Sequence, residues 1–93
     1  MWTLEDDKGI PAPENSEGRR VMPFWSTRSR VEKLIASVPA YAGFRPREIA
    51  LDEFQSRWLD GLERDRLLVG INWSGHSATG YDVEPSDGWL AAE

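Results

Sequence analysis

The residues of this chain that could carry out chemistry lie close together near its C-terminal end. His76, the only histidine, stands between Ser74 and Ser77, and Asp82 follows a few residues later. Serine, histidine and aspartate are the members of a hydrolytic triad. Both serines share one turn with the histidine, however, and such close neighbours do not reach the geometry of nucleophile, base and orienting group. A Gly-x-Ser-x-Gly elbow is also missing from the sequence. The pattern therefore does not indicate a serine hydrolase.

Metal, phosphate and acid–base chemistry lack their usual residues as well. The chain has no cysteine, so a transition-metal site would have to consist almost wholly of carboxylates. The acidic run Glu5-Asp-Asp7 lacks the spacing of a calcium-binding loop, and the glycines form no phosphate-binding motif. Asp82 and Glu84 share a strand face, but nothing apolar beside them would tune a carboxyl group for catalysis. We expect no catalytic residue, no metal and no cofactor.

The remaining candidate feature is a group of aromatic and polar side chains. Trp, Tyr and Arg dominate the binding hot spots of protein interfaces, and this short chain has five tryptophans. Taken singly, Trp25 and Trp73 are expected in the core, because large rings supply much of the buried surface of a small domain. If they are exposed together with Tyr81, they form a recognition patch. The candidate binding residues are Trp25, Arg28, Asn72, Trp73, His76 and Tyr81.

Period-2 patterns indicate the strands that must position these side chains. Short strands are predicted over residues 2–4, 21–25 and 47–51, the second at a sheet edge because Pro23 cannot donate to a ladder. A β-hairpin is predicted over residues 67–83. In its first strand Leu67, Val69, Ile71 and Trp73 alternate with Leu68, Gly70 and Asn72, which places the first set on one face.

Helical spacing is clearest over residues 26–38, where apolar residues recur at i, i+3, i+4 and i+7 from Val31. Ser26 or Thr27 can cap this helix, and Pro39 ends it. A second helix is predicted to begin with Asp52 as its cap, and Gly61 is a point where it can be interrupted. A short C-terminal helix is predicted to bear Trp89 and Leu90. The predicted fold is α+β in two layers: a mainly antiparallel sheet of four to five strands, with the two main helices on one face and the short C-terminal helix, in one domain over residues 1–93.

Composition narrows the classes of partner. The net charge of −5 disfavours nucleic acid, which attracts proteins that neutralise its phosphates. The basic residues are nevertheless concentrated in the first half, so a nucleic-acid-binding face through Arg19, Arg20, Arg28 and Arg30 stays an alternative. No apolar run is long enough to span a bilayer, and the N-terminal residues lack the features of a signal peptide. We expect no membrane partner and a cytoplasmic location; the oligomeric state is left open.

Several segments form a specific combination along nearly the whole chain: Trp2-Thr-Leu, Gly9-Ile-Pro-Ala-Pro13, Met22-Pro-Phe-Trp-Ser26, Ser29-Arg-Val-Glu-Lys-Leu-Ile35, Trp58, Arg64-Asp-Arg-Leu-Leu-Val-Gly-Ile-Asn-Trp-Ser-Gly75 and Ala78-Thr-Gly-Tyr-Asp-Val-Glu-Pro85. In this order and spacing they resemble a family of short bacterial proteins, the domain of unknown function 2750. The resemblance implies a bacterial, cytoplasmic, stand-alone domain and brings no activity, cofactor or site residue with it. Members carry a further N-terminal segment, so we expect either a start placed too late here or the loss of an element that would cover the sheet, which would leave an apolar patch open.

Two functions are therefore predicted as alternatives. The first is a non-catalytic protein-interaction module of adaptor or immunity type, for which an exposed patch of Trp25, Trp73 and Tyr81 would be the evidence. The second is a small-molecule-binding domain or minor enzyme with a cleft between the C-terminal hairpin and the first helix. In that cleft Arg28, Asn72, His76 and Asp82 would supply the polar groups, and their convergence would be the evidence.

Overall fold

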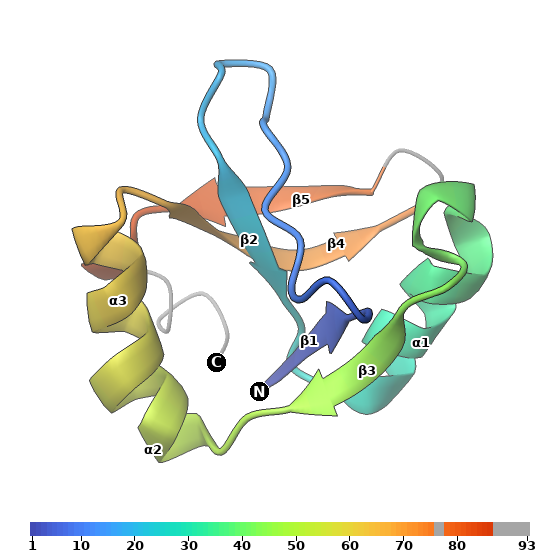
Figure 1. The fold of residues 1–93 in the computed structure, drawn as a ribbon, viewed down its shortest axis with the longest axis horizontal. Helices are drawn as coiled ribbons and strands as arrows, with labels where there is room; N and C mark the ends of the chain where they lie inside the picture. The colour runs from blue at the N-terminus through green and yellow to red at the C-terminus, as the bar shows by residue number, and fades with distance from the viewer. Residues whose placement is uncertain (76–77, 87–93) are drawn as a thin grey trace.

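The computed structural model of the protein describes residues 1–75 and 78–86. These residues form a mixture of strands and helices, so the α+β class is confirmed (Figure 1). The elements, in chain order, are β1 (Trp2–Glu5), β2 (Val21–Phe24), α1 (Arg28–Ser37), the 3₁₀ turn η1 (Pro39–Tyr41), β3 (Arg45–Glu48), α2 (Leu51–Glu53), the π-helical segment η2 (Phe54–Trp58), α3 (Leu59–Arg64), β4 (Leu68–Ser74) and β5 (Thr79–Val83).

The strands form two small sheets, so the prediction of one mainly antiparallel sheet is wrong in this respect. β1 pairs antiparallel with β3, whereas β4 lies between a parallel neighbour, β2, and an antiparallel one, β5. A single backbone bridge between Trp2 and Trp25 joins β1 to the end of β2. The next positions of that ladder would pair Leu4 with Pro23, which has no N–H to donate. Thr3 instead donates its hydroxyl to the Pro23 carbonyl at 2.7 Å, and the sheet divides there.

The two main helical segments cover opposite faces of the three-stranded sheet, not one face as predicted (Figure 1). Val31 and Leu34 of α1 belong to a buried cluster that includes Leu68. Phe54, with residues of α3, belongs to a second cluster that includes Val69. Both faces of β4 are therefore buried, as is typical of a strand with a parallel neighbour. A strand buried on both sides needs cover on both sides, which accounts for the separation of the helices.

The helix ends agree only in part with the sequence pattern. Thr27 is the N-cap of α1, and its hydroxyl accepts a hydrogen bond from the Arg30 N–H at 3.4 Å, as predicted. The second helical segment begins at Leu51, so the prediction that Asp52 caps it is wrong. This segment runs through Gly61 without interruption and ends at Arg64. Pro85 and Ser86 are helical, and the remainder of the predicted short C-terminal helix, with Trp89 and Leu90, lies outside the described residues.

A bulge in β4 decides where the hairpin side chains point. Its pairing with β5 changes register between Ile71 and Ser74, and Asn72 has a φ of 51°. Asparagine tolerates this left-handed conformation better than most residues. The bulge turns Trp73 away from the face of Val69 and Ile71 and into the cluster of α1. The simple alternation predicted for this strand is therefore wrong at Trp73, because one bulged residue reverses the faces that follow it.

Candidate functional site

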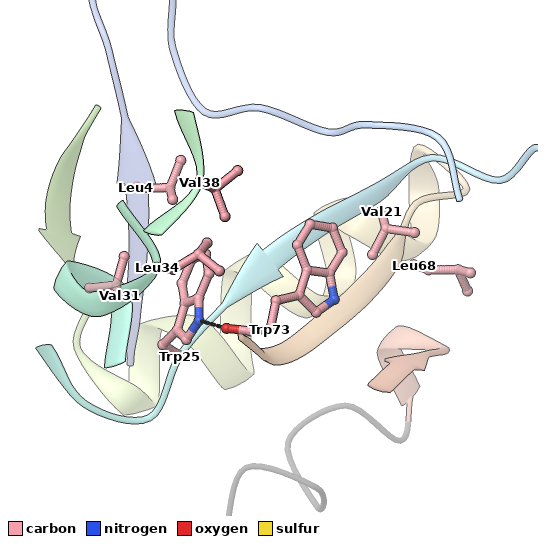
Figure 2. Packing of buried hydrophobic residues seen from close by; sticks show 8 residues of the cluster. All are labelled: Leu4, Val21, Trp25, Val31, Leu34, Val38, Leu68 and Trp73. Atoms are coloured by element: carbon pink, nitrogen blue, oxygen red, sulfur yellow. Dashed lines mark hydrogen bonds between the residues drawn. The ribbon is translucent and has the colours of Figure 1, made fainter. Parts of the chain in front are cut away.

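Trp25 and Trp73 are core residues and do not form an exposed patch. Trp25 is fully buried and Trp73 is 6% exposed. Figure 2 shows the two indoles in one cluster with Leu34 of α1, joined by a hydrogen bond from Trp25 Nε1 to the Trp73 carbonyl at 2.8 Å. The burial expected for each ring taken singly is confirmed. With so little exposed surface, neither ring can anchor a protein partner in this conformation.

The indole of Trp73 lies directly on the backbone of the sheet. A Cβ atom added at Gly70 would stand 2.6 Å from Trp73 Cε2, and one added at Gly80 would stand 2.8 Å from Trp73 Cδ1. Trp73 Nε1 donates a hydrogen bond to Asp82 Oδ1 at 3.0 Å. The lack of side chains at Gly70 and Gly80 thus leaves space for the ring, and the Asp82 carboxylate fixes its orientation.

The other predicted site residues lie on separate surfaces or outside the described chain. Tyr81 lies on β5 and is 74% exposed. Arg28 pairs with Glu32 one turn along α1, and its guanidinium stands 5.6 Å from the ring centroid of Trp2. His76 is outside the described residues. Asn72 and Asp82 line two different cavities, so the set Arg28, Asn72 and Asp82 does not converge on one point.

A cleft nevertheless lies between α1 and the end of β4, where the alternative function requires it. We call it the basic cleft; its volume is about 800 Å³. Two of its residues, Arg30 and Lys33, are cationic, and no acidic residue lines it within the described chain. Neither cation forms an ion pair with a described residue. The described lining residues are Thr27, Ser29, Arg30, Lys33, Leu34, Ser37, Asn72, Trp73, Ser74 and Gly75.

Asn72 presents a hydrogen-bond donor at this cleft. Its Oδ1 atom accepts hydrogen bonds from the Ser26 N–H at 3.0 Å and from the Ser26 hydroxyl at 3.4 Å. The side-chain oxygen is therefore occupied, and the amide nitrogen, which can only donate, is left for a ligand. The cleft therefore combines the positive charges of Arg30 and Lys33 with the neutral amide donor of Asn72. Such a set suits a ligand that carries negative charge and several acceptor atoms.

A second cavity lies on the same face of the sheet, on another side of Trp73. We call it the acidic pocket; its volume is about 350 Å³. Asp82 and Glu14 supply carboxylates, and no basic side chain lines it among the described residues. The described lining residues are Pro13, Glu14, Asn15, Ser16, Val21, Tyr41, Trp73, Ala78, Gly80 and Asp82.

Neither Arg30 nor Lys33 was predicted for the cleft, and Arg30 was named only for the alternative nucleic-acid face, although the sequence contains a signal for both. They are three residues apart, so they share a helix face, and neither has an acidic residue three or four positions away. Arg28, by contrast, has Glu32 at i+4 and forms that pair. Two further arginines of the alternative nucleic-acid face already have partners within the protein. Arg19 forms an ion pair with Glu84 at 3.6 Å, and Arg20 Nε donates a hydrogen bond to the Ala12 carbonyl at 3.1 Å.

Residues 1–75 and 78–86 contain no group of three or more His, Cys, Asp and Glu side chains arranged to hold a metal ion. Within the same ranges, no helix combines the length and the apolar character needed to cross a bilayer.

Comparison with known proteins identifies the family. No curated protein and no solved structure matches the chain. The family model described as protein of unknown function DUF2750 matches residues 1–88 of the 93-residue chain. The match covers both cavities and all of the described elements. The chain therefore belongs to the DUF2750 family.

Proposed function

We propose that this protein is a small-molecule-binding domain whose ligand is a small organic or inorganic anion held in the basic cleft. The observation that carries this proposal is the charge of the cleft lining. The chain as a whole has a net charge of −5, yet the described lining of the cleft contains two cations and no acid. Like charges left without counter-ions raise the electrostatic energy of a folded protein, and a bound anion would lower it.

The dimensions of the cleft agree with a ligand of metabolite size. Its volume of about 800 Å³ lies within the usual range for small-molecule sites. Leu34 and Trp73 supply apolar wall, while Ser29 and Ser74 supply hydroxyls at the rim. Arg30 can bind a carboxylate or a phosphate through two parallel hydrogen bonds, and Lys33 can add a point charge. The ligand class that fits is a phosphorylated or polycarboxylated small molecule.

Isothermal titration calorimetry with pyrophosphate and with citrate tests the proposal. Ionic strength should be held constant with sodium chloride, because exposed charges are strongly screened by salt. We expect saturable binding of at least one of the two anions. The double substitution Arg30→Gln/Lys33→Gln should weaken it by about tenfold or more, since one lost charge-assisted hydrogen bond accounts for that much.

The matched control is Lys8→Gln/Arg64→Gln, which changes the net charge equally. Both control residues are exposed, form no ion pair with a described residue and do not line the cleft. If the control weakens binding as much as the cleft variant does, the anion is attracted by overall charge, and the cleft is not its site. The absence of saturable binding for both anions would also refute the proposal.

A protein-interaction role of adaptor or immunity type is the second candidate function, and Tyr81 favours it. This side chain is 74% exposed on β5, the last strand in the order β2–β4–β5. An edge strand offers free backbone hydrogen-bonding groups, and an exposed tyrosine beside it is a typical anchor. Affinity capture from bacterial cytoplasm with wild type and with Tyr81→Ser tests this role. A partner held equally by both proteins would show that this edge is not the contact surface.

A further inference from the structure

The charged side chains that line the acidic pocket are opposite in sign to those that line the basic cleft. Asp82 lies on β5, and Glu14 lies in the segment between β1 and β2. Neither carboxylate forms an ion pair with a described residue. Trp73 and Tyr41 supply aromatic wall. We propose that the acidic pocket is a second binding site, independent of the basic cleft, and that it takes a small organic cation of the alkylammonium class.

The hydrogen bonds around Asp82 are the first argument. Its Oδ1 accepts from Trp73 Nε1 at 3.0 Å, and its Oδ2 stands 3.5 Å from Asn15 Nδ2. Both partners are neutral donors, so they fix the carboxylate in place without cancelling its charge. A carboxylate held in this way is preorganised for a cation, because the cost of ordering the side chain is met before the ligand arrives.

The aromatic walls are the second argument, and they distinguish an organic ammonium from a metal ion. A metal ion needs several oxygen ligands at short distance. Among the described residues, no three or more His, Cys, Asp or Glu side chains come together to supply such ligands. An alkylammonium ion instead needs one or two carboxylates for its charge and aromatic or apolar surface for its carbon atoms. The pocket offers two carboxylates, Tyr41 and Trp73 within about 350 Å³, which is room for a small amine.

The indole N–H signal of Trp73 is a direct probe of this site. In a ¹H–¹⁵N correlation spectrum it reports on the hydrogen bond to Asp82, and it can be assigned from the spectrum of Trp73→Phe. Choline, methylammonium and putrescine are titrated at millimolar concentrations and constant ionic strength. We expect a saturable shift of this signal with at least one of the three. The neutral isostere of choline, 3,3-dimethylbutan-1-ol, should bind about tenfold more weakly, as expected when the ionic attraction is lost.

Two variants locate the charge that matters. Glu14→Gln changes an exposed side chain that makes no described hydrogen bond or ion pair, so it should fold as wild type does. Asp82→Asn keeps an oxygen that can accept from Trp73 Nε1 and removes the charge. Together they should weaken amine binding by about tenfold or more. The matched control Glu48→Gln/Asp52→Asn removes two exposed carboxylates away from the pocket and should leave binding unchanged.

Three results would overturn this second site. The first is the absence of a saturable shift for all three amines. The second is equal binding of choline and its neutral isostere. The third is equal weakening by the pocket variant and by the control variant. Because Arg30→Gln/Lys33→Gln does not touch the acidic pocket, amine binding should persist in that variant, and the two sites can fail or succeed separately.

Discussion

Gly70→Ala should destabilise the protein although it adds only one methyl group. The added Cβ would stand 2.6 Å from Trp73 Cε2 and Nε1 and 2.7 Å from Trp73 Cζ2. Optimal contact between carbon atoms lies at about 3.5–4.0 Å, so the ring would have to move by about 1 Å. Trp73 is 6% exposed, and its Nε1 is hydrogen-bonded to Asp82, so the ring has little freedom to move.

The expected cost follows from overpacking in other protein cores. One extra methylene in a well-packed site costs about 1–3 kcal/mol. For a chain of this size that loss lowers the melting temperature by about 5–20 °C. Gly61→Ala is the matched control, because the residue is in α3 and, apart from its chain neighbours and the backbone of its own helix, nothing lies within 4 Å of a Cβ added there. Alanine at that helical position should raise stability by about 0.5–1 kcal/mol.

Urea unfolding monitored by far-ultraviolet circular dichroism measures both effects. A double-mutant cycle with Trp73→Leu then tests the cause. Once the indole is removed, Gly70→Ala should cost much less, and the coupling free energy should be about 1–2 kcal/mol. If Gly70→Ala costs the same in both backgrounds, the clash with Trp73 is not the origin of the loss. If it stabilises the protein as Gly61→Ala does, the close packing of ring and strand is refuted.

Thr3→Val should destabilise the protein by about 1–3 kcal/mol, measured by urea unfolding, because the buried hydroxyl is the donor to the Pro23 carbonyl at 2.7 Å. Burial raises the pKa of the Tyr41 phenol above its ordinary value of 10.0. The unfolded chain therefore loses this proton first, and the free energy of unfolding should fall as pH rises above 10.0. Tyr41→Phe should remove that part of the slope in unfolding measured across this range, and an unchanged slope would contradict the assignment. Arg28→Gln loses an exposed ion pair and a contact with the Trp2 ring, and calorimetry should show a loss of no more than about 1 kcal/mol.

Much of the element order could be predicted from local pattern, and the arrangement of the elements could not. The helix at α1 and the hairpin of β4 and β5 follow from periodicities that each element carries within itself. The division of the strands into two sheets depends on a single residue, Pro23, which stands where the pairing of β1 with β2 would otherwise continue. The placement of helices on both faces was signalled by Leu68, an apolar residue on the side of β4 expected to face away from the core.

The candidate sites were harder to predict because they depend on one backbone conformation. Alternation places Trp73 beside Val69 and Ile71, and only the left-handed conformation of Asn72 moves it to the other face. The sequence contains the permissive residue but no rule that requires the bulge. The same conformation explains why Trp73 and Tyr81, which were expected to share a patch, do not: the tryptophan is buried and the tyrosine is exposed.

The bulge at Asn72 therefore links packing to both proposed sites. It brings the indole over Gly70 and Gly80, where it can reach Asp82, and it places Asn72 itself at the basic cleft with its oxygen bound to Ser26. The ring then forms wall in two cavities whose described charges have opposite signs. A cation in the acidic pocket would face carboxylates, and an anion in the basic cleft would face Arg30 and Lys33. The buried indole between the two cavities is a region of low dielectric constant, where charge interactions are screened less than in water. Strain in a positive-φ residue is usually retained where the surrounding structure requires it. Here it is retained at the residue that decides the position of Trp73.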